Sequence, residues 1–88
     1  MVMTGRWHIM KVDVCLYASL ASRLPKHSEG NTASLELPDG TSVAALLSQL
    51  EILPDEPKII FRNGLHAKPD DVIKDGDRIA VFPPVAGG

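Results

Sequence analysis

The sequence has a single cysteine, Cys15, among its 88 residues. One cysteine excludes an internal disulfide and any metal site built from several cysteines, so the chain does not require an oxidising compartment. No stretch approaches the ~20 consecutive apolar residues that span a bilayer, and the N-terminal segment lacks the apolar run of a signal peptide. We therefore expect a soluble, cytoplasmic protein with no membrane partner.

An excess of charge of one sign is missing too. The chain carries 9 Lys and Arg against 11 Asp and Glu, a formal net charge of -2, and its basic residues are scattered. Because no basic field gathers phosphates, nucleic acid is not an expected partner. Hydrophobic residues make up 44% and charged residues 23% of the chain, which is an ordinary globular balance. One domain of this size buries only ~60% of its unfolded surface, which leaves little room for an enclosed active site.

Motifs that bind phosphate or metal are also lacking. There is no Gly-rich phosphate loop, so any ATP must be bound by a partner. His8, His27 and His66 show no metal-ligand spacing, and the aspartates of residues 70–77 lack calcium-loop spacing. Cys15 lies in a predicted strand without a basic neighbour, so we expect an inert thiol rather than a persulfide relay. Since no nucleophile, base and oxyanion donor can be assembled, a stand-alone enzyme is the weakest hypothesis.

The first half of the chain predicts two strands and a short helix. Apolar and polar residues alternate over residues 10–17, which predicts a strand with one buried face and with Cys15 on the other face. Residues 18–24 favour a short helix. Residues 33–37 predict a second strand, closed by a Pro-Asp-Gly turn.

The main helix is predicted from apolar residues that recur at helical spacing from Val43 to Leu50. Either Thr41 or Ser42 can cap its start, because a hydroxyl there accepts a hydrogen bond from a first-turn amide. Pro54 and Pro57 are expected to end it. The helix places one apolar stripe against the sheet.

The second half predicts three more strands. Residues 58–62 read as a strand, and Asn63-Gly64 suits a two-residue hairpin turn leading to residues 65–67. Residues 74–77 form a turn that feeds the last strand, residues 78–82. In that strand Ile79 and Val81 should face inward.

The order of elements favours an α+β fold in which a mixed sheet packs on one main helix, a roll of the β-grasp kind. We expect residues 1–9 to be a flexible N-terminal extension, residues 10–82 to be the β-grasp domain and residues 83–88 to be an extended tail. The start codon stays open among Met1, Met3 and Met10.

The tail carries the chemistry that the sequence predicts. Pro83 and Pro84 favour an extended conformation that projects the last residues from the domain and lowers the entropy lost on insertion into a partner. Gly87 and Gly88 leave no Cβ near the terminal carboxylate, so the tail can thread a narrow channel. A carboxylate is unreactive until ATP converts it to an acyl-adenylate, which a persulfide can then convert to a thiocarboxylate.

The final strand followed by Phe82-Pro83-Pro84-Val85-Ala86-Gly87-Gly88, with the turn of residues 74–78 and Asn63-Gly64 upstream, resembles the molybdopterin synthase small subunit and other ubiquitin-like, MoaD/ThiS-type sulfur carriers. The resemblance implies that Gly88 is adenylated by a partner similar to ubiquitin-activating enzymes, which uses ATP and Mg²⁺. It also implies a thiocarboxylate that delivers sulfur in a second partner, such as the molybdopterin synthase large subunit. The chain itself would bind no cofactor. It departs from the family in its N-terminal extension and in the loop of residues 25–31.

A partner interface is predicted on the outer face of the sheet. Strict alternation places Ile60 and Ala80 outward, with Phe82 at the root of the tail. Arg62 and Arg78 share that outward phase and would orient acidic groups of the partner. The other residues predicted for this interface are Pro83, Pro84, Val85 and Ala86.

Several functions remain open. The preferred one is a sulfur carrier for molybdopterin synthesis, and a carrier for thiamine or cysteine synthesis has the same tail chemistry. Gly88 could instead form amides with lysines of other proteins, as in a ubiquitin-like modifier. The remaining hypothesis is a β-grasp interaction module with an inert tail.

Overall fold

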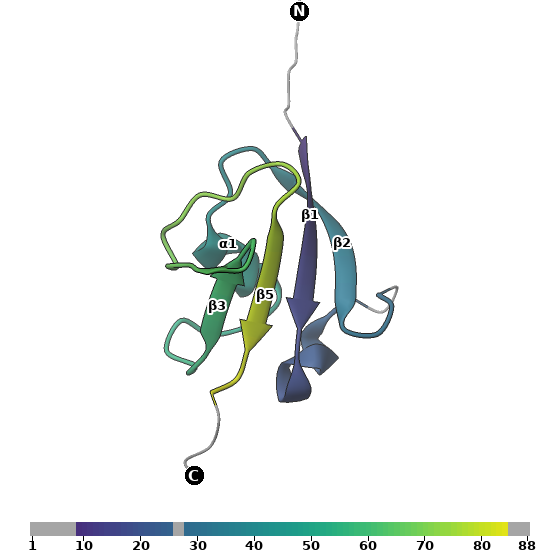
Figure 1. Cartoon of the computed structure of the whole chain (residues 1–88), viewed down its shortest axis with the longest axis vertical. Coiled ribbons are helices and arrows are strands. Elements are labelled where there is room, and N and C mark those ends of the chain that lie inside the picture. Colours follow the sequence, from purple (N-terminus) through teal and green to yellow (C-terminus); the bar gives the residue numbers. More distant parts are fainter. Residues whose placement is uncertain (1–8, 26–27, 85–88) are drawn as a thin grey trace, which may run out of the picture.

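The structure, a computed structural model, describes residues 9–25 and 28–84 (Figure 1). Five strands form one mixed sheet in the order β2-β1-β5-β3-β4. β1 runs antiparallel to β2 and parallel to β5, and β3 runs antiparallel to β5 and β4. The elements are β1 (Ile9–Leu16), the 3-10 helix η1 (Ala18–Arg23), β2 (Thr32–Pro38), α1 (Val43–Gln49), β3 (Ile59–Arg62), β4 (Leu65–His66) and β5 (Arg78–Phe82). The mixed sheet with one main helix predicted from the sequence is therefore confirmed.

The core lies between α1 and the inner face of the sheet. Figure 1 shows α1 behind the sheet on the side of β3 and β5. Val43 and Leu46 of the helix are fully buried, as are Ile79 and Val81 of β5, which face inward as predicted. Alternate residues of β1 complete this layer because a strand points every second side chain to one face.

Ser42 is the residue that caps α1. Its Oγ accepts a hydrogen bond of 3.1 Å from the amide of Ala45, which satisfies one of the unpaired amides of the first turn. Thr41, the other candidate, instead donates its hydroxyl to the carbonyl of Pro38 at 2.7 Å. The two neighbouring hydroxyl groups thus hold the turn and the helix start separately.

The helix ends earlier than the sequence suggested. Glu51 has a positive φ of 63°. The amide of Ile52 donates to the carbonyl of Leu47 at 2.9 Å, and that of Glu51 donates to Ser48 at 3.0 Å. These two bonds form a Schellman motif, which ends a helix by satisfying its last carbonyls. The prediction that the two downstream prolines end the helix is wrong, because they follow only after this motif.

The turn between β3 and β4 has the geometry that its sequence predicts. Asn63 and Gly64 both have positive φ, at 54° and 84°. Two positive φ angles in succession match the twist of a tight hairpin.

Within the described ranges no helix is long and apolar enough to cross a membrane.

Candidate functional site at the root of the tail

The tail starts from the central strand of the sheet. β5 lies between β1 and β3, so it is hydrogen-bonded along both edges. The amide of Tyr17, just after β1, also donates to the carbonyl of Val81 at 3.2 Å. Because β1 and β5 are parallel, both strands end at the same end of the sheet, where η1 and Pro83 follow (Figure 1). The root of the tail is therefore held from both sides.

Four ring side chains cross the sheet at this root, and we call them the aromatic row: Tyr17, Phe82, Phe61 and His66. The rings of Tyr17 and Phe82 stack in parallel, with centroids 4.4 Å apart and planes within 3°. The ring of Phe61 meets that of Phe82 edge-on, with centroids 5.8 Å apart, and lies tilted by 45° against that of His66 at 4.6 Å. Offset and edge-on pairs stabilise beyond the area they bury. The row fixes the side chain of Phe82, from which the tail departs.

An open, largely apolar hollow of about 460 Å³ lies beside the aromatic row. Its floor includes Phe61, Ala80 and Phe82, and the exposed Arg78 lies at its rim. Asn63 and Gly64 of the hairpin turn complete the lining. Partly exposed apolar groups with a cation at the rim are typical of surfaces that bind another protein.

The prediction of which β3 side chains face outward is wrong. Ile60 is only 6% exposed and pairs with Val81 on the inner face. The outward residues are Ile59 and Phe61, which pair with Phe82 and Ala80. The sequence could not show which face of β3 is buried, because three consecutive residues of the strand are apolar. The pairing with β5 determines it.

Arg62 lies at an inward-facing position of β3, where it pairs with Ile79, so its predicted outward position is wrong. Its guanidinium lies 3.2 Å from the carboxylate of Asp77, which is 7% exposed. Asn63 donates to the same carboxylate at 2.9 Å, as does the amide of Lys74. Burial by itself raises the pKa of Asp77, but the hydrogen bonds from Asn63, Lys74 and Arg62 outweigh burial and lower the pKa below its ordinary value. Arg62 therefore serves the fold, and Arg78 remains as the exposed cation of the site.

Cys15 lies on the outer face of the sheet, as predicted, but it is fully buried. Its register partners are Thr32 and Ala80, and its sulfur lies 3.5 Å from the hydroxyl of Thr32. A fully buried thiol lacks the exposure that makes a cysteine reactive.

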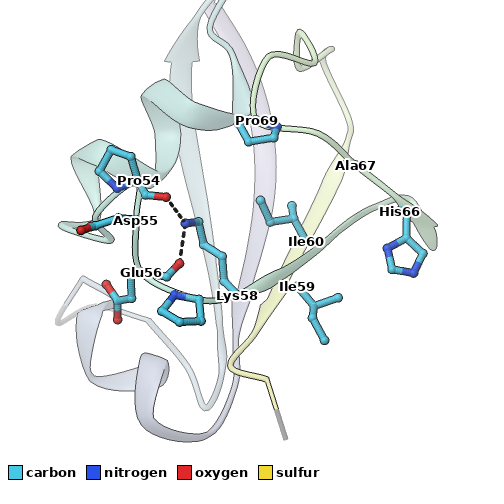
Figure 2. Close-up of a pocket in the computed structure, with 10 residues that line it drawn as sticks. Pro54, Asp55, Glu56, Lys58, Ile59, Ile60, His66, Ala67 and Pro69 are labelled. Atoms are coloured by element: carbon cyan, nitrogen blue, oxygen red, sulfur yellow. Dashed lines mark hydrogen bonds between the residues drawn. The ribbon is translucent and has the colours of Figure 1, made fainter.

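A second hollow lies between β3 and the loop that follows α1 (Figure 2). Lys58 lines it, but its ammonium group donates to the carbonyls of Leu53, Pro54 and Glu56 at 3.1, 3.1 and 2.7 Å. This cation therefore stabilises the loop instead of offering a free charge. No group of three or more metal-ligating side chains occurs in the described part of the chain.

The sequence predicted only Phe82 of the aromatic row as a site residue and missed Tyr17, Phe61 and His66. Residue type alone gives Tyr17 no role, because only the long-range register brings its ring against Phe82. Four predicted site residues lie outside the described residues: Val85, Ala86, Gly87 and Gly88. His8 and His27 lie outside them as well.

The fold is similar to that of several solved structures. A putative molybdopterin converting factor subunit 1 from Pyrococcus furiosus matches with 29% identity and a TM-score of 0.66, over 86% of this chain and 99% of that chain. Small archaeal modifier protein 1 from Haloferax volcanii matches with 23% identity and a TM-score of 0.68, over 86% and 99%. A complex of subunits 1 and 2 of molybdopterin-converting factor from Helicobacter pylori 26695 matches with 24% identity and a TM-score of 0.57, over 90% and 100%.

A search of curated proteins found no match. A family model, however, matches residues 21–88, most of the described domain together with the tail. It includes the strand, the aromatic residue and the prolines from which the tail departs. The chain therefore belongs to the ThiS family of ubiquitin-like sulfur carriers.

Proposed function

We propose that this protein is a sulfur carrier whose working group is the carboxylate of Gly88. The observation that carries the proposal is the origin of the tail in β5, the central strand, directly after the stacked ring of Phe82. A rigid root lets a partner position the end of the tail by gripping the domain, because little freedom remains between the two. Membership of the ThiS family supports the same role.

The proposed chemistry has two stages. The Gly88 carboxylate attacks the α-phosphate of ATP, held with Mg²⁺ by an activating partner, and pyrophosphate leaves. The terminal sulfur of a persulfide then attacks the acyl carbon and AMP leaves, which gives an acyl disulfide. A thiol then cleaves this acyl disulfide. The tail keeps one sulfur as a thiocarboxylate, and the thiol forms a disulfide with the former carrier of the persulfide. The chain supplies only the acyl group, and its partners supply the catalytic groups.

The aromatic row and its hollow are the proposed docking surface for these partners. Phe82, Phe61 and Ala80 offer apolar area, and Arg78 offers a positive charge for an acidic group of the partner. An acceptor similar to the molybdopterin synthase large subunit is supported by the Helicobacter pylori complex, in which subunit 1 is bound to subunit 2. We therefore favour molybdopterin synthesis as the pathway, carried out in the cytoplasm.

A protein modifier is the second candidate, favoured by the structural likeness to small archaeal modifier protein 1. In that role a lysine amine of a target would attack the same acyl-adenylate, AMP would leave and an amide would form. Both functions share activation at Gly88 and differ in the nucleophile that follows.

The test is intact-mass spectrometry of the protein purified from its native cell. We expect Gly88 to be the terminal residue, with a fraction of the protein ~16 Da heavier because oxygen is replaced by sulfur. A variant that lacks Gly87 and Gly88 is the control and should show no such species. Conjugates of higher mass would support the modifier. An unmodified mass, even after incubation with ATP, Mg²⁺, the activating enzyme and a persulfide donor, would contradict both and favour an inert tail.

A further inference from the structure

β2 is a free edge of the sheet. It occupies one end of the strand order and spans seven residues, whereas β4, at the other edge, spans two. In Figure 1 it is the outermost strand on the right. An edge strand presents unpaired amide and carbonyl groups, which another extended chain can bind.

The hydrogen bonds at the start of β2 show which groups are unpaired. The amide of Leu16 donates to the carbonyl of Asn31 at 2.9 Å, so Asn31 faces β1. Thr32, the next residue, instead exchanges two bonds of 3.0 Å with Glu29, so its backbone faces away from β1. Because the direction alternates along an antiparallel strand, every second residue after Thr32 also turns its backbone toward the free edge.

Ser34 and Glu36 are these residues. Among the residues that the structure describes, none outside the sheet is hydrogen-bonded to their amides or carbonyls. Both ends of the free edge are already used: Thr32 is paired with Glu29, and the carbonyl of Pro38 accepts from the amide and hydroxyl of Thr41. What remains is a short open stretch centred on Leu35.

The side chains around this stretch differ between the two faces of the sheet. Leu35 points to the inner face, is half-buried and packs against the core. On the outer face, an open hollow of about 530 Å³ adjoins Ser34. Asp13 and Glu29 line it, and its other lining residues are Ser28, Thr32, Ala33 and Ser34.

Two acidic side chains lie beside Ser34 at the free edge. Asp13 is the register partner of Ser34 on β1, and Glu29 lies at the start of the same edge. Glu36 is exposed on the same face, with Lys11 as its register partner. A cation near Ser34 would therefore meet two carboxylates.

We propose that this open stretch of β2 binds an extended peptide of alternating basic and apolar residues as an antiparallel sixth strand. Lys or Arg residues of the peptide lie opposite Ser34 and Glu36, where their backbones pair with the free groups and their side chains meet the acidic outer face. An apolar residue lies opposite Leu35 and covers its exposed part. The proposal rests on the geometry of β2 and is independent of the proposed chemistry at Gly88.

A second copy of this chain fits the same edge less well. In a two-fold pairing centred on Leu35, the Glu36 of each copy lies opposite Ser34 of the other. Its carboxylate would then lie over the hollow lined by Asp13 and Glu29, and like charges opposite one another destabilise a strand pair. A basic peptide reverses the sign of this interaction.

The test uses a capped pentapeptide, Val-Lys-Val-Lys-Val, titrated into the ¹⁵N-labelled full chain and followed by NMR. We expect saturable shifts centred on the amides of Ser34 and Glu36, weaker in high salt. N-methylation of both Lys amides removes the donors that face β2 and should weaken binding at least about tenfold. N-methylation of the central Val amide, which faces away, should leave affinity nearly unchanged, and a Val-Glu-Val-Glu-Val peptide should not bind.

A matched pair of variants tests the protein side. Ser34→Pro removes the free-edge amide without removing a bond to β1, and should weaken binding at least about tenfold, whereas Ser34→Ala keeps the amide and should bind like the parent. Equal affinities of the two N-methylated peptides would overturn the proposal, even if the proline variant did not fold. Shifts centred on Phe61 and Phe82, no saturable binding, or concentration-dependent shifts of β2 without peptide would overturn it too.

Discussion

Asp77 shows how one buried carboxylate can hold together a hairpin turn and the strand that carries the tail. Arg62 and Asn63 come from the end of β3 and the turn after it, and Lys74 comes from the loop before β5. Their donors converge on two carboxylate oxygens. Charge-assisted hydrogen bonds of this kind are stronger than neutral ones, so the ionised form is the stabilising form.

The pKa of Asp77 gives the direction of a pH effect. Because it is lower in the folded protein than the ordinary 3.8, stability from the carboxylate is complete above that value and is lost as pH falls through the native pKa. Asp77→Asn should lower the free energy of unfolding by about 2 kcal/mol at pH 7, measured by urea denaturation. The difference from the parent should shrink once the pH falls below 3.8. Asp70→Asn, at an exposed position, is the control. If Asp77→Asn lowered the free energy of unfolding by no more than Asp70→Asn does, the role of Asp77 would be refuted.

Phe82 has a predicted role in partner binding. Phe82→Ala removes the ring that stacks on Tyr17 and forms part of the apolar hollow. We expect affinity for the activating enzyme, measured by calorimetry, to fall about tenfold or more, while the circular dichroism spectrum remains that of a folded protein. Tyr17→Phe keeps the stacked ring and should bind like the parent. Unchanged affinity of the alanine variant would remove Phe82 from the interface.

Among the elements, β1, β3 and β5 were all predicted as strands, but the buried face was predicted correctly only for β1 and β5. Apolar and polar side chains alternate clearly over residues 10–14 of β1, whereas Ile59, Ile60 and Phe61 are all apolar, so either face of β3 was possible. The Pro-Pro and Gly-Gly residues of the tail led to the proposed chemistry from residue type alone, and that chemistry stays a prediction. The aromatic row could not be predicted, because it depends on the register between β1, β5 and β3.

The end of α1 supplies a prediction about stability. Glu51 has the left-handed backbone conformation, which costs a residue with a Cβ more than it costs glycine. Glu51→Gly should raise the free energy of unfolding by about 0.5 to 1 kcal/mol, and its carbonyl can still accept from Arg23. Gln49→Gly, inside the helix, should lower it by about 1 kcal/mol. The same sign for both variants in urea denaturation would contradict this account of the helix end.

At the scale of the whole molecule, the described chain begins and ends at opposite ends of the sheet. β1 starts at one end, and β5, which is parallel to it, finishes at the other (Figure 1). The start of β1 is thus remote from the root of the tail. This separation distinguishes the two termini as places for modification.

We therefore expect an N-terminal affinity tag to leave thiocarboxylate formation within about twofold of the untagged protein, because β1 starts at the opposite end of the sheet from the aromatic row. One alanine added after Gly88 should abolish it, since the activated carboxylate would no longer follow two glycines. Mass spectrometry after incubation with the activating enzyme, ATP and a persulfide donor measures both. Equal loss in the two proteins would place the recognition of the domain near the N-terminus.

The parallel pairing of β1 with β5 also has a mechanical consequence. Force applied to the tail and resisted at the N-terminus pulls these neighbouring strands in opposite directions along their length. The bonds between them, including those of Asp13 to Asp77 and Tyr17 to Val81, are then loaded in shear and share the force, instead of unzipping one after another. In the proposed function a partner holds the tail, and the domain would then resist traction in this direction.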